Sequence, residues 1–167
     1  MDTIPMTQSD YDALMFLIER VGGKQGEARL QMGESHSANA GDGWHSDDFK
    51  RTIVDEAVQG QRLAELQDFA DRAEIVTPEE QNIEVQLGSV VVLKYEDGTR
   101  ETLLLVGFAC RNLGDAVQEV SLRAPSAKLL LGKRYGDEVT LGNKKAKVLD
   151  ILSPSESAEF LAGAAKA

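Results

Sequence analysis

The sequence predicts an α+β protein in which an N-terminal antiparallel α-helical coiled-coil hairpin precedes a small antiparallel β domain with one short helix. Up to residue 76, apolar side chains recur every three or four positions, the period of a helix. After residue 80, short β-branched and aliphatic runs alternate with turn signals. The change of period predicts a hairpin over 6–76, a β domain over 80–152 and a flexible tail over 153–167 that is either frayed helix or disorder.

The first helix is predicted over residues 7–32, with Thr7 and Ser9 as available N-caps. Its apolar positions at helical spacing are Tyr11, Leu14, Leu17, Ile18 and Val21. Three glycines between residues 22 and 26 interrupt this pattern, each costing about 1 kcal/mol relative to alanine inside a helix. The small polar residues 33–46 predict a turn or loop.

A second, longer helix is predicted from Asp47 to Ala73. A row of small and apolar residues steps by three or four, the spacing of a narrow helix–helix seam: Phe49, Ile53, Ala57, Gly60, Leu63, Leu66 and Ala70. At 1.5 Å per residue this helix spans roughly 40 Å. Thr77 and Pro78 end it, because a proline disfavours helical backbone in the residue before it.

The second half predicts five short strands, at Val90–Leu93, Leu103–Val106, Val117–Leu122, Val139–Leu141 and Ala146–Ile151. Asp97-Gly98 and Gly142-Asn143 are typical of tight hairpin turns. Between the third and fourth strands, Pro125 and Gly132 bound a short helix, because proline favours the first helical position and glycine the position after the end.

Composition limits the classes of function. The formal net charge of −10 does not suit binding to naked duplex nucleic acid, which requires clustered lysine and arginine, so any nucleic acid would be reached through another protein. A single cysteine, Cys110, cannot form an internal disulfide. No apolar run approaches the roughly 18 residues of a membrane helix, and residues 1–12 lack a signal-peptide pattern. A monomeric cytoplasmic protein without membrane contact is expected.

Three segments carry a family resemblance over residues 6–152. They are MTQSDYDALMFLIERV at the start of the first helix, GDGWHSDDF between the helices and APSAKLLLGK in the β domain. The chain resembles the bacterial Gre transcript-cleavage factors. The segment APSAKLLLGK, with the strand that follows it, is the most specific of the three.

The resemblance implies an FKBP-like β domain that docks at the rim of the RNA polymerase secondary channel, while the hairpin enters the channel. Two acidic residues at the tip then help to hold a second Mg²⁺, so that the polymerase hydrolyses the 3′ end of backtracked RNA. Carboxylates suit this task because Mg²⁺ prefers oxygen ligands. The factor would have no cofactor of its own and would use only the Mg²⁺ of the polymerase active site. It would contact the nascent RNA 3′ end only indirectly. It would not be an enzyme, but at most an accessory factor that stimulates the polymerase's own RNA cleavage.

Carried over residue by residue, the tip aspartate of the family falls on Asp42, the predicted metal-directed acid. Its partner glutamate, three positions later, falls on His45, and a neutral imidazole is a poor Mg²⁺ ligand. Asp47 and Asp48 are possible substitutes. They also have a purely structural explanation, because carboxylates in a first helical turn stabilise the helix N-terminus by about 0.3–1 kcal/mol each.

Two further groups of residues are expected to contact the polymerase. Trp44, His45 and Ser46 are the contacting residues at the tip, and Ser46 is also a suitable N-cap for the second helix. Arg123, Ala124 and Pro125 match the family position at the channel rim. Pro125 is explained equally well by helix initiation alone.

The sequence favours a regulator that occupies the secondary channel and modulates elongation, as an inhibitor with weak or no stimulation of cleavage. This reading rests on His45 and on a first arm about four residues shorter than the family's spacing. One alternative is an active cleavage factor that uses Asp42 with Asp47 or Asp48 to rescue backtracked complexes. Another is a protein-interaction module outside transcription, in which the hairpin binds an unrelated protein.

Overall fold

The computed structural model describes residues 2–38, 47–81, 83–111 and 113–165. By the density of its internal contacts the chain divides into two compact units. The first unit contains Leu14–Arg72. The second contains Thr3–Ala13 together with Ala73–Ala167. The domain limits drawn from the sequence stay a prediction. Within the described ranges, no helix is both long enough and apolar enough to cross a membrane.

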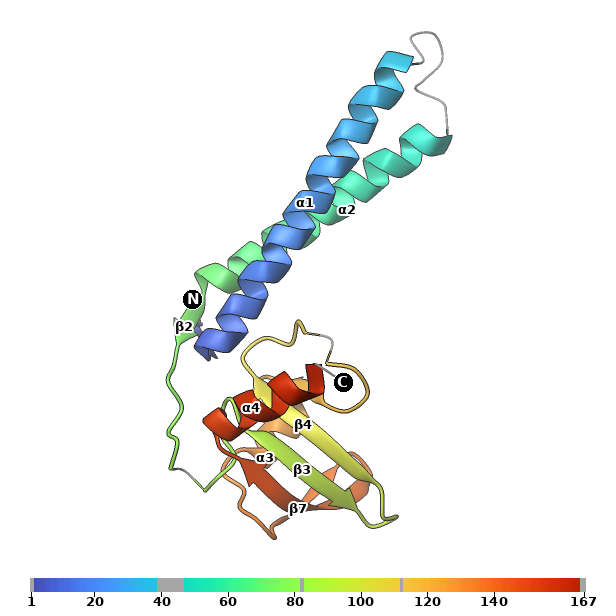
Figure 1. Cartoon of the computed structure of the whole chain (residues 1–167). Coiled ribbons are helices and arrows are strands. Elements are labelled where there is room, and N and C mark those ends of the chain that lie inside the picture. The colour runs from blue at the N-terminus through green and yellow to red at the C-terminus, as the bar shows by residue number, and fades with distance from the viewer. Residues whose placement is uncertain (1, 39–46, 82, 112, 166–167) are drawn as a thin grey trace. The chain divides into compact units, whose positions relative to one another are not determined.

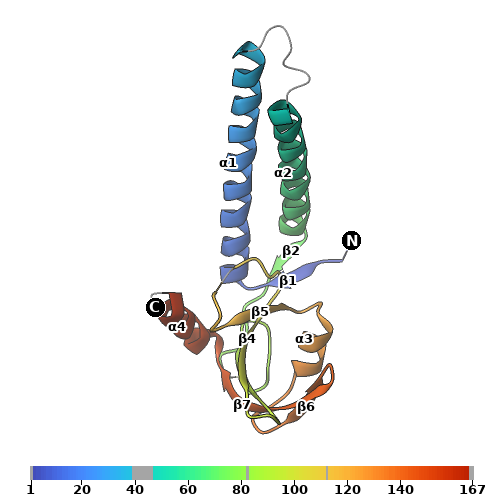
Figure 2. The ribbon, with the colours of Figure 1, turned by 90° about the vertical axis from the view of Figure 1, so that its right-hand side faces the viewer.

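Two long helices form most of the first unit. Helix α1 covers Gln8–Ala38, so that its first residues belong to the second unit, and helix α2 covers Asp47–Asp71. The two helices lie side by side with opposite chain directions (Figures 1 and 2). Of the apolar positions expected at the seam, Leu14, Val21 and Leu66 are buried, whereas Ile53 is 39% exposed.

Helix α1 is longer than predicted. The expected end at residue 32 is wrong, because the helix continues to Ala38, into the segment 33–46 that was expected to be a loop. Gly22, Gly23 and Gly26 lie inside it without ending it. The cost of each glycine is about 1 kcal/mol, which good helix formers such as Glu, Arg, Leu and Gln around them can offset.

A pair of short parallel strands joins two distant parts of the second unit. Strand β1 (Ile4–Met6) pairs with β2 (Ala73–Ile75), with Ile4 opposite Ala73. The side chains of Ile4 and Met6 are almost completely buried. The prediction that Ala73 ends the second helix is therefore wrong: α2 ends at Asp71, and the chain becomes extended two residues later.

The five predicted strands are confirmed, and they form one sheet of the order β5-β4-β3-β7-β6. Their bounds are β3 Val90–Tyr95, β4 Arg100–Val106, β5 Gln118–Ser121, β6 Glu138–Leu141 and β7 Lys144–Leu152. All neighbours are antiparallel except β4 and β5. Both predicted hairpin turns are present, and Gly98 and Gly142 take the positive φ angles, 86° and 63°, that such turns require.

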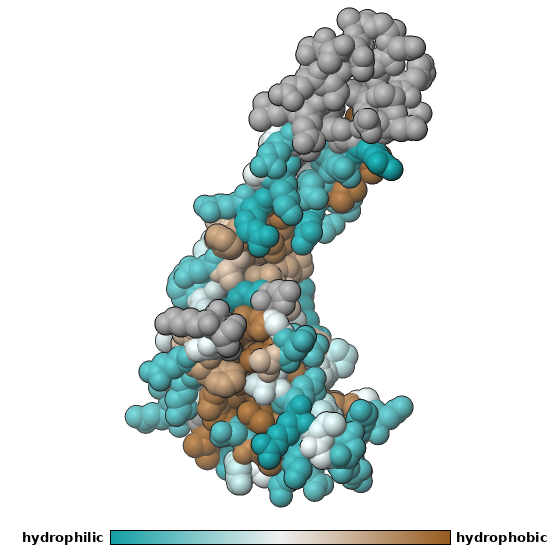
Figure 3. Space-filling model, turned by 45° about the vertical axis from the view of Figure 1, so that its right-hand side comes forward, coloured by the Kyte–Doolittle hydropathy of each residue, from teal (hydrophilic) through white to brown (hydrophobic). Residues whose placement is uncertain are grey.

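The predicted short helix is α3, Pro125–Leu130, with proline at its start. It covers one face of the sheet, where Ala127 and Leu130 are fully buried in a core with Leu93, Leu105 and Val148. On the face in view in Figure 3, hydrophobic side chains of the second unit gather in one region with hydrophilic side chains around it.

The opposite face of the sheet carries an ordered helix in the stretch where the sequence predicted frayed helix or disorder. Helix α4, Pro154–Ala165, lies across the face away from α3 (Figures 1 and 2), and Leu161 packs against the core residues of that face. The hydroxyl of Ser157, which is 2% exposed, accepts a hydrogen bond from Val90 N at 3.0 Å. The tail expected as frayed helix or disorder is thus an ordered helix as far as Ala165, beside the one short helix expected in the β domain. A capping box stabilises the N-terminus of α4: Ser153 N donates to the Glu156 carboxylate, and Glu156 N donates to the Ser153 hydroxyl.

Candidate functional site

The predicted tip residues fall mostly outside the part of the chain that the structure describes. Asp42, Trp44, His45 and Ser46 lie in the undescribed segment 39–46. Asp47 and Asp48 are the first two residues of α2. The metal-directed role of Asp42 and the substitute roles of Asp47 and Asp48 stay predictions. Elsewhere, among the described side chains, no three His, Cys, Asp or Glu residues are placed to hold a metal ion.

The three predicted docking residues lie together on the surface of the second unit, where β5 passes into α3. Ala124 N donates to Ser121 O at 2.8 Å, and Arg123 N donates to the Ser121 hydroxyl at 3.3 Å. Ala124 is the N-cap of α3 with extended backbone angles, and Pro125 follows as the first helical residue. Both Arg123 and Pro125 are exposed, whereas Ala127, two residues on, is buried.

This corner is therefore a fixed element that presents an exposed arginine beside an exposed proline. The buried Ala127 and Leu130 anchor α3 from below, and Lys128 N closes the first helical turn on Ala124 O at 3.2 Å. Pro125 lacks an N–H, so it exposes an apolar ring at the helix start without leaving a donor unpaired. Such an arrangement suits a protein contact with an apolar centre and a cationic edge.

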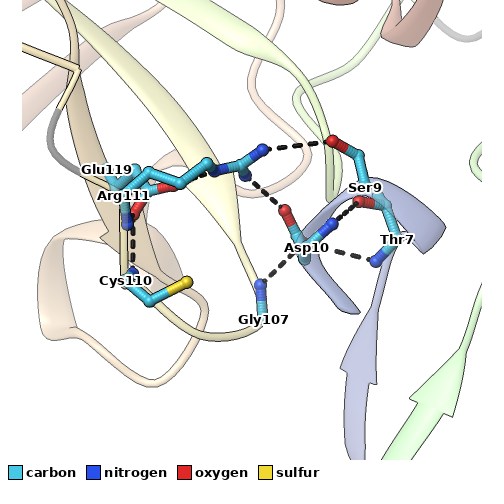
Figure 4. Close-up of polar contacts among 7 residues, drawn as sticks. All are labelled: Thr7, Ser9, Asp10, Gly107, Cys110, Arg111 and Glu119. Carbon is cyan, nitrogen blue, oxygen red and sulfur yellow. Dashed lines mark hydrogen bonds and ion pairs between the residues drawn. The ribbon is translucent and has the colours of Figure 1, made fainter. Parts of the chain in front are cut away.

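A network of buried charges, which sequence reasoning missed, holds the start of α1 against the loop after β4. Asp10 and Glu119 are each 3% exposed at the side chain, and Arg111 lies between them (Figure 4). The Arg111 guanidinium pairs with Asp10 Oδ1 at 2.6 Å and also binds the Glu119 carboxylate. All three residues belong to the second unit.

The two carboxylates also accept backbone hydrogen bonds. Asp10 accepts from Thr7 N and Gly107 N, both at 3.2 Å, and its own N–H donates to the Thr7 hydroxyl. Thr7 is thus the N-cap of α1, as predicted, and forms a reciprocal box with Asp10. Glu119 accepts from the backbone N–H groups of Cys110 and Arg111, both at 2.8 Å (Figure 4).

The electrostatics of this network indicate a structural role, which is to hold the start of α1 to the loop after β4. Burial opposes the charge of Arg111, but the hydrogen bond and charge of Glu119 and the charge of Asp10 together raise the pKa of Arg111 above its usual value. Burial and the charge of Glu119 raise the pKa of the Cys110 thiol to about 11, so the thiol stays protonated at neutral pH and is a poor nucleophile. Cys110 is only half-buried, on a loop.

Gly107 makes the close approach of β1 possible. A Cβ atom at this position would lie 2.1 Å from Pro5 O and 2.7 Å from Met6 Cγ. Only a residue without a side chain therefore fits between β4 and β1 here. The sequence signal was a glycine directly after an apolar strand, a feature that often marks a close backbone contact.

Known proteins with related sequences place these features in context. Residues 79–153 match the family model described as "Transcription elongation factor, GreA/GreB, C-term". The transcription elongation factor GreA of Paracoccus denitrificans is 29% identical, over 90% of this chain and 98% of the relative. GreA of Geobacillus kaustophilus is 31% identical, over 65% and 69%. The transcription inhibitor protein Gfh1 of Thermus thermophilus is 29% identical, over 86% and 91%.

Proposed function

Because the chain belongs to the GreA/GreB family of transcription elongation factors, we propose that it binds RNA polymerase and modulates elongation from the secondary channel. In this proposal α1 and α2 form a coiled-coil hairpin that carries residues 39–46 into the channel. The sheet β3–β7 with α3 is an FKBP-like domain that docks at the channel rim through Arg123, Ala124 and Pro125. The chain itself is an accessory of the polymerase and catalyses nothing alone.

The observation that carries the direction of the effect is His45. Its place is that of the glutamate which, by the resemblance, would complete the acidic pair with Asp42. A neutral imidazole adds neither negative charge nor a preferred ligand for Mg²⁺. The factor therefore obstructs the channel or perturbs the polymerase metal site without efficient stimulation of RNA cleavage. The similarity to a protein named as a transcription inhibitor supports this direction.

An active cleavage factor is the second candidate, because the tip still holds Asp42 and because α2 begins with Asp47 and Asp48. Relatives named as elongation factors are as similar in sequence as the inhibitor is. In this reading one of the two helix-initial aspartates supplies the second acid. Membership of a family of transcription factors argues against a role outside transcription.

The test is transcription by purified RNA polymerase on a template that yields backtracked complexes, with and without the full-length protein. We expect reduced RNA synthesis without shortened 3′ ends. Shortened RNA with the unmodified protein would identify it as a cleavage factor. If neither synthesis nor RNA length changes, the polymerase assignment itself fails.

Two variants sharpen this experiment. His45→Glu restores the acidic pair, so cleavage should appear, whereas the double variant with Asp42→Ala should lose it again. If the unmodified protein already stimulates cleavage by the polymerase, and Asp42→Ala abolishes this stimulation, the second candidate holds. Arg123→Glu, which reverses the charge of the corner before α3, should weaken polymerase binding, and Lys128→Glu, an exposed residue within α3, serves as the charge-matched control.

A further inference from the structure

Tyr135 is displayed on a turn whose backbone is fixed from both ends. Asp137 N donates to Arg134 O at 3.0 Å, and Arg134 N donates to the Asp137 carboxylate at 2.8 Å. Gly136 has a φ angle of 86°, the positive value that the third position of a type II turn requires. Gly136 N also donates to Val148 O in β7 at 2.8 Å. The aromatic side chain at the second position is nevertheless 74% exposed.

Ile83 is a second large apolar residue exposed to solvent, with an exposed fraction of 68%. The segment after it is tied to the segment before Tyr135, because Gly132 N donates to Val85 O at 2.9 Å and Val85 N donates to Lys133 O at 2.8 Å. Ile83 and Tyr135 line the same hollow, which has a volume of about 310 Å³. Neither the core on the α3 face nor that on the α4 face includes them.

Three carboxylates line the same hollow, and each is held in place by a hydrogen bond. The Ser155 hydroxyl donates to Glu80 at 2.8 Å, Ser153 N donates to Glu156 at 2.9 Å, and Ile151 N donates to Asp150 at 2.9 Å. The hydrogen bonds from the backbone and hydroxyl of Ser153 lower the pKa of Glu156 below its ordinary value, so they favour its charged form. The described lining includes no lysine or arginine.

We infer that this acidic hollow, defined by Ile83, Tyr135, Glu80, Asp150 and Glu156, is a second docking surface that binds a segment of RNA polymerase in which a basic side chain is flanked by apolar ones. The inference rests on the proposed function and adds a contact separate from Arg123, Ala124 and Pro125. Fixed carboxylates complement lysine or arginine and repel the phosphates of nucleic acid. A rigid tyrosine offers a large contact area at low entropic cost, as interface anchors do.

The test is equilibrium binding of the full-length labelled protein to purified core RNA polymerase at low and high salt. Truncating an interface anchor typically weakens binding by a factor of ten or more, so we expect that loss for Tyr135→Ala. Tyr135→Phe keeps the ring and should stay within twofold of the unmodified protein. Asp150→Asn should weaken binding several-fold at low salt, and the difference should shrink at high salt, because salt screens charge pairs.

Glu159→Gln is the charge-matched control, because Glu159 is exposed on α4 and does not line the hollow. It should leave binding unchanged at both salt concentrations. Thermal unfolding of each variant checks that the fold is intact, which is expected because the substituted side chains carry no core contacts.

The measurement distinguishes a failure of the docking surface from a failure of the proposed function. If the unmodified protein binds the polymerase while Tyr135→Ala and Asp150→Asn stay within twofold of it, the acidic hollow is not a docking surface and the proposed function stands. If only Asp150→Asn has no effect, the basic character of the segment is refuted. If the unmodified protein does not bind the polymerase at all, the proposed function fails, and the inferred partner fails with it.

Discussion

Replacing Asp10 with alanine should destabilise the second unit by about 3 kcal/mol. The change removes the acceptor of the buried Gly107 N–H, and an orphaned buried donor costs about 1–3 kcal/mol. It also removes the bond from Thr7 N at the start of α1, and capping interactions of this kind contribute about 1 kcal/mol. Arg111 keeps its pairing with Glu119, so its charge is not left without a partner.

Asp12→Ala is the matched control. Asp12 lies on the same helix, is exposed and accepts only a surface hydrogen bond from Gln8 at 2.8 Å, so its loss should cost about 0.5 kcal/mol or less. Urea unfolding followed by tyrosine circular dichroism is a suitable assay, because all three tyrosines, at positions 11, 95 and 135, belong to the second unit.

With a slope of roughly 2 kcal/mol per molar urea, the midpoint for Asp10→Ala should fall by about 1.5 M. The midpoint for Asp12→Ala should move by about 0.25 M or less. Equal midpoints for the two variants would show that the network around Arg111 does not hold the second unit together.

Three further outcomes are expected. Gly107→Ala should destabilise the second unit by about 1–3 kcal/mol in the same urea assay, because its Cβ would lie 2.1 Å from Pro5 O. The control is Gly163→Ala on α4, where a Cβ meets open space, and this change should be neutral or stabilising. Burial and the hydrogen bond to Glu101 raise the pKa of Tyr95 to about 12, above its ordinary value of 10.0, so the stability that this neutral tyrosine contributes should be lost as pH rises from 10 to 12. Denaturation at several pH values should show this loss, and Tyr95→Phe should lack it. Since the pKa of Cys110 is about 11 and not 9.0, a thiol reagent at pH 8 should find about a hundredfold less thiolate in the folded protein than in the urea-unfolded protein, and comparable reaction rates would contradict this.

The elements that were predicted correctly are those whose bounding residues lie within or next to them in the sequence. Pro125 and Gly132 bound α3 within a few residues, and Asp97-Gly98 closes a hairpin whose strands follow at once. The alternation of strands and turns is likewise readable without knowledge of distant contacts. Each of these elements could therefore be placed before its neighbours were known.

The parts that escaped prediction depend on contacts between distant residues. Strand β2 continues the helical spacing of α2 in the sequence, and only its pairing with Ile4–Met6 makes it extended. Asp10 and Arg111 are 101 positions apart, so nothing local links their charges. Helix α4 did have a local signal, the Ser153–Glu156 capping box, which the expectation of a frayed chain end outweighed.

For the candidate site, sequence reasoning identified Arg123 and Pro125 by resemblance, and the structure brings them together on one exposed corner. The acidic hollow could not be found in this way. Its acids come from two distant stretches, one with Glu80 and the other with Asp150 and Glu156, and the exposure of Tyr135 follows from a turn that β7 holds in place. Neither property is encoded within a short window of sequence.

The second unit consists of two separate stretches of the chain, and this has a consequence for folding during synthesis on the ribosome. Residues 3–13 are synthesised well before the surfaces that receive them, which are Ala73–Ile75 and the loop from Gly107 to Arg111. The apolar strand Ile4–Met6 must therefore stay unpaired while the two long helices emerge, and long-range pairing of this kind is slow. A nascent chain paused between α2 and β5 would expose this strand to other chains, so aggregation or chaperone binding during synthesis should depend on Ile4 and Met6 more than on any residue of the helices.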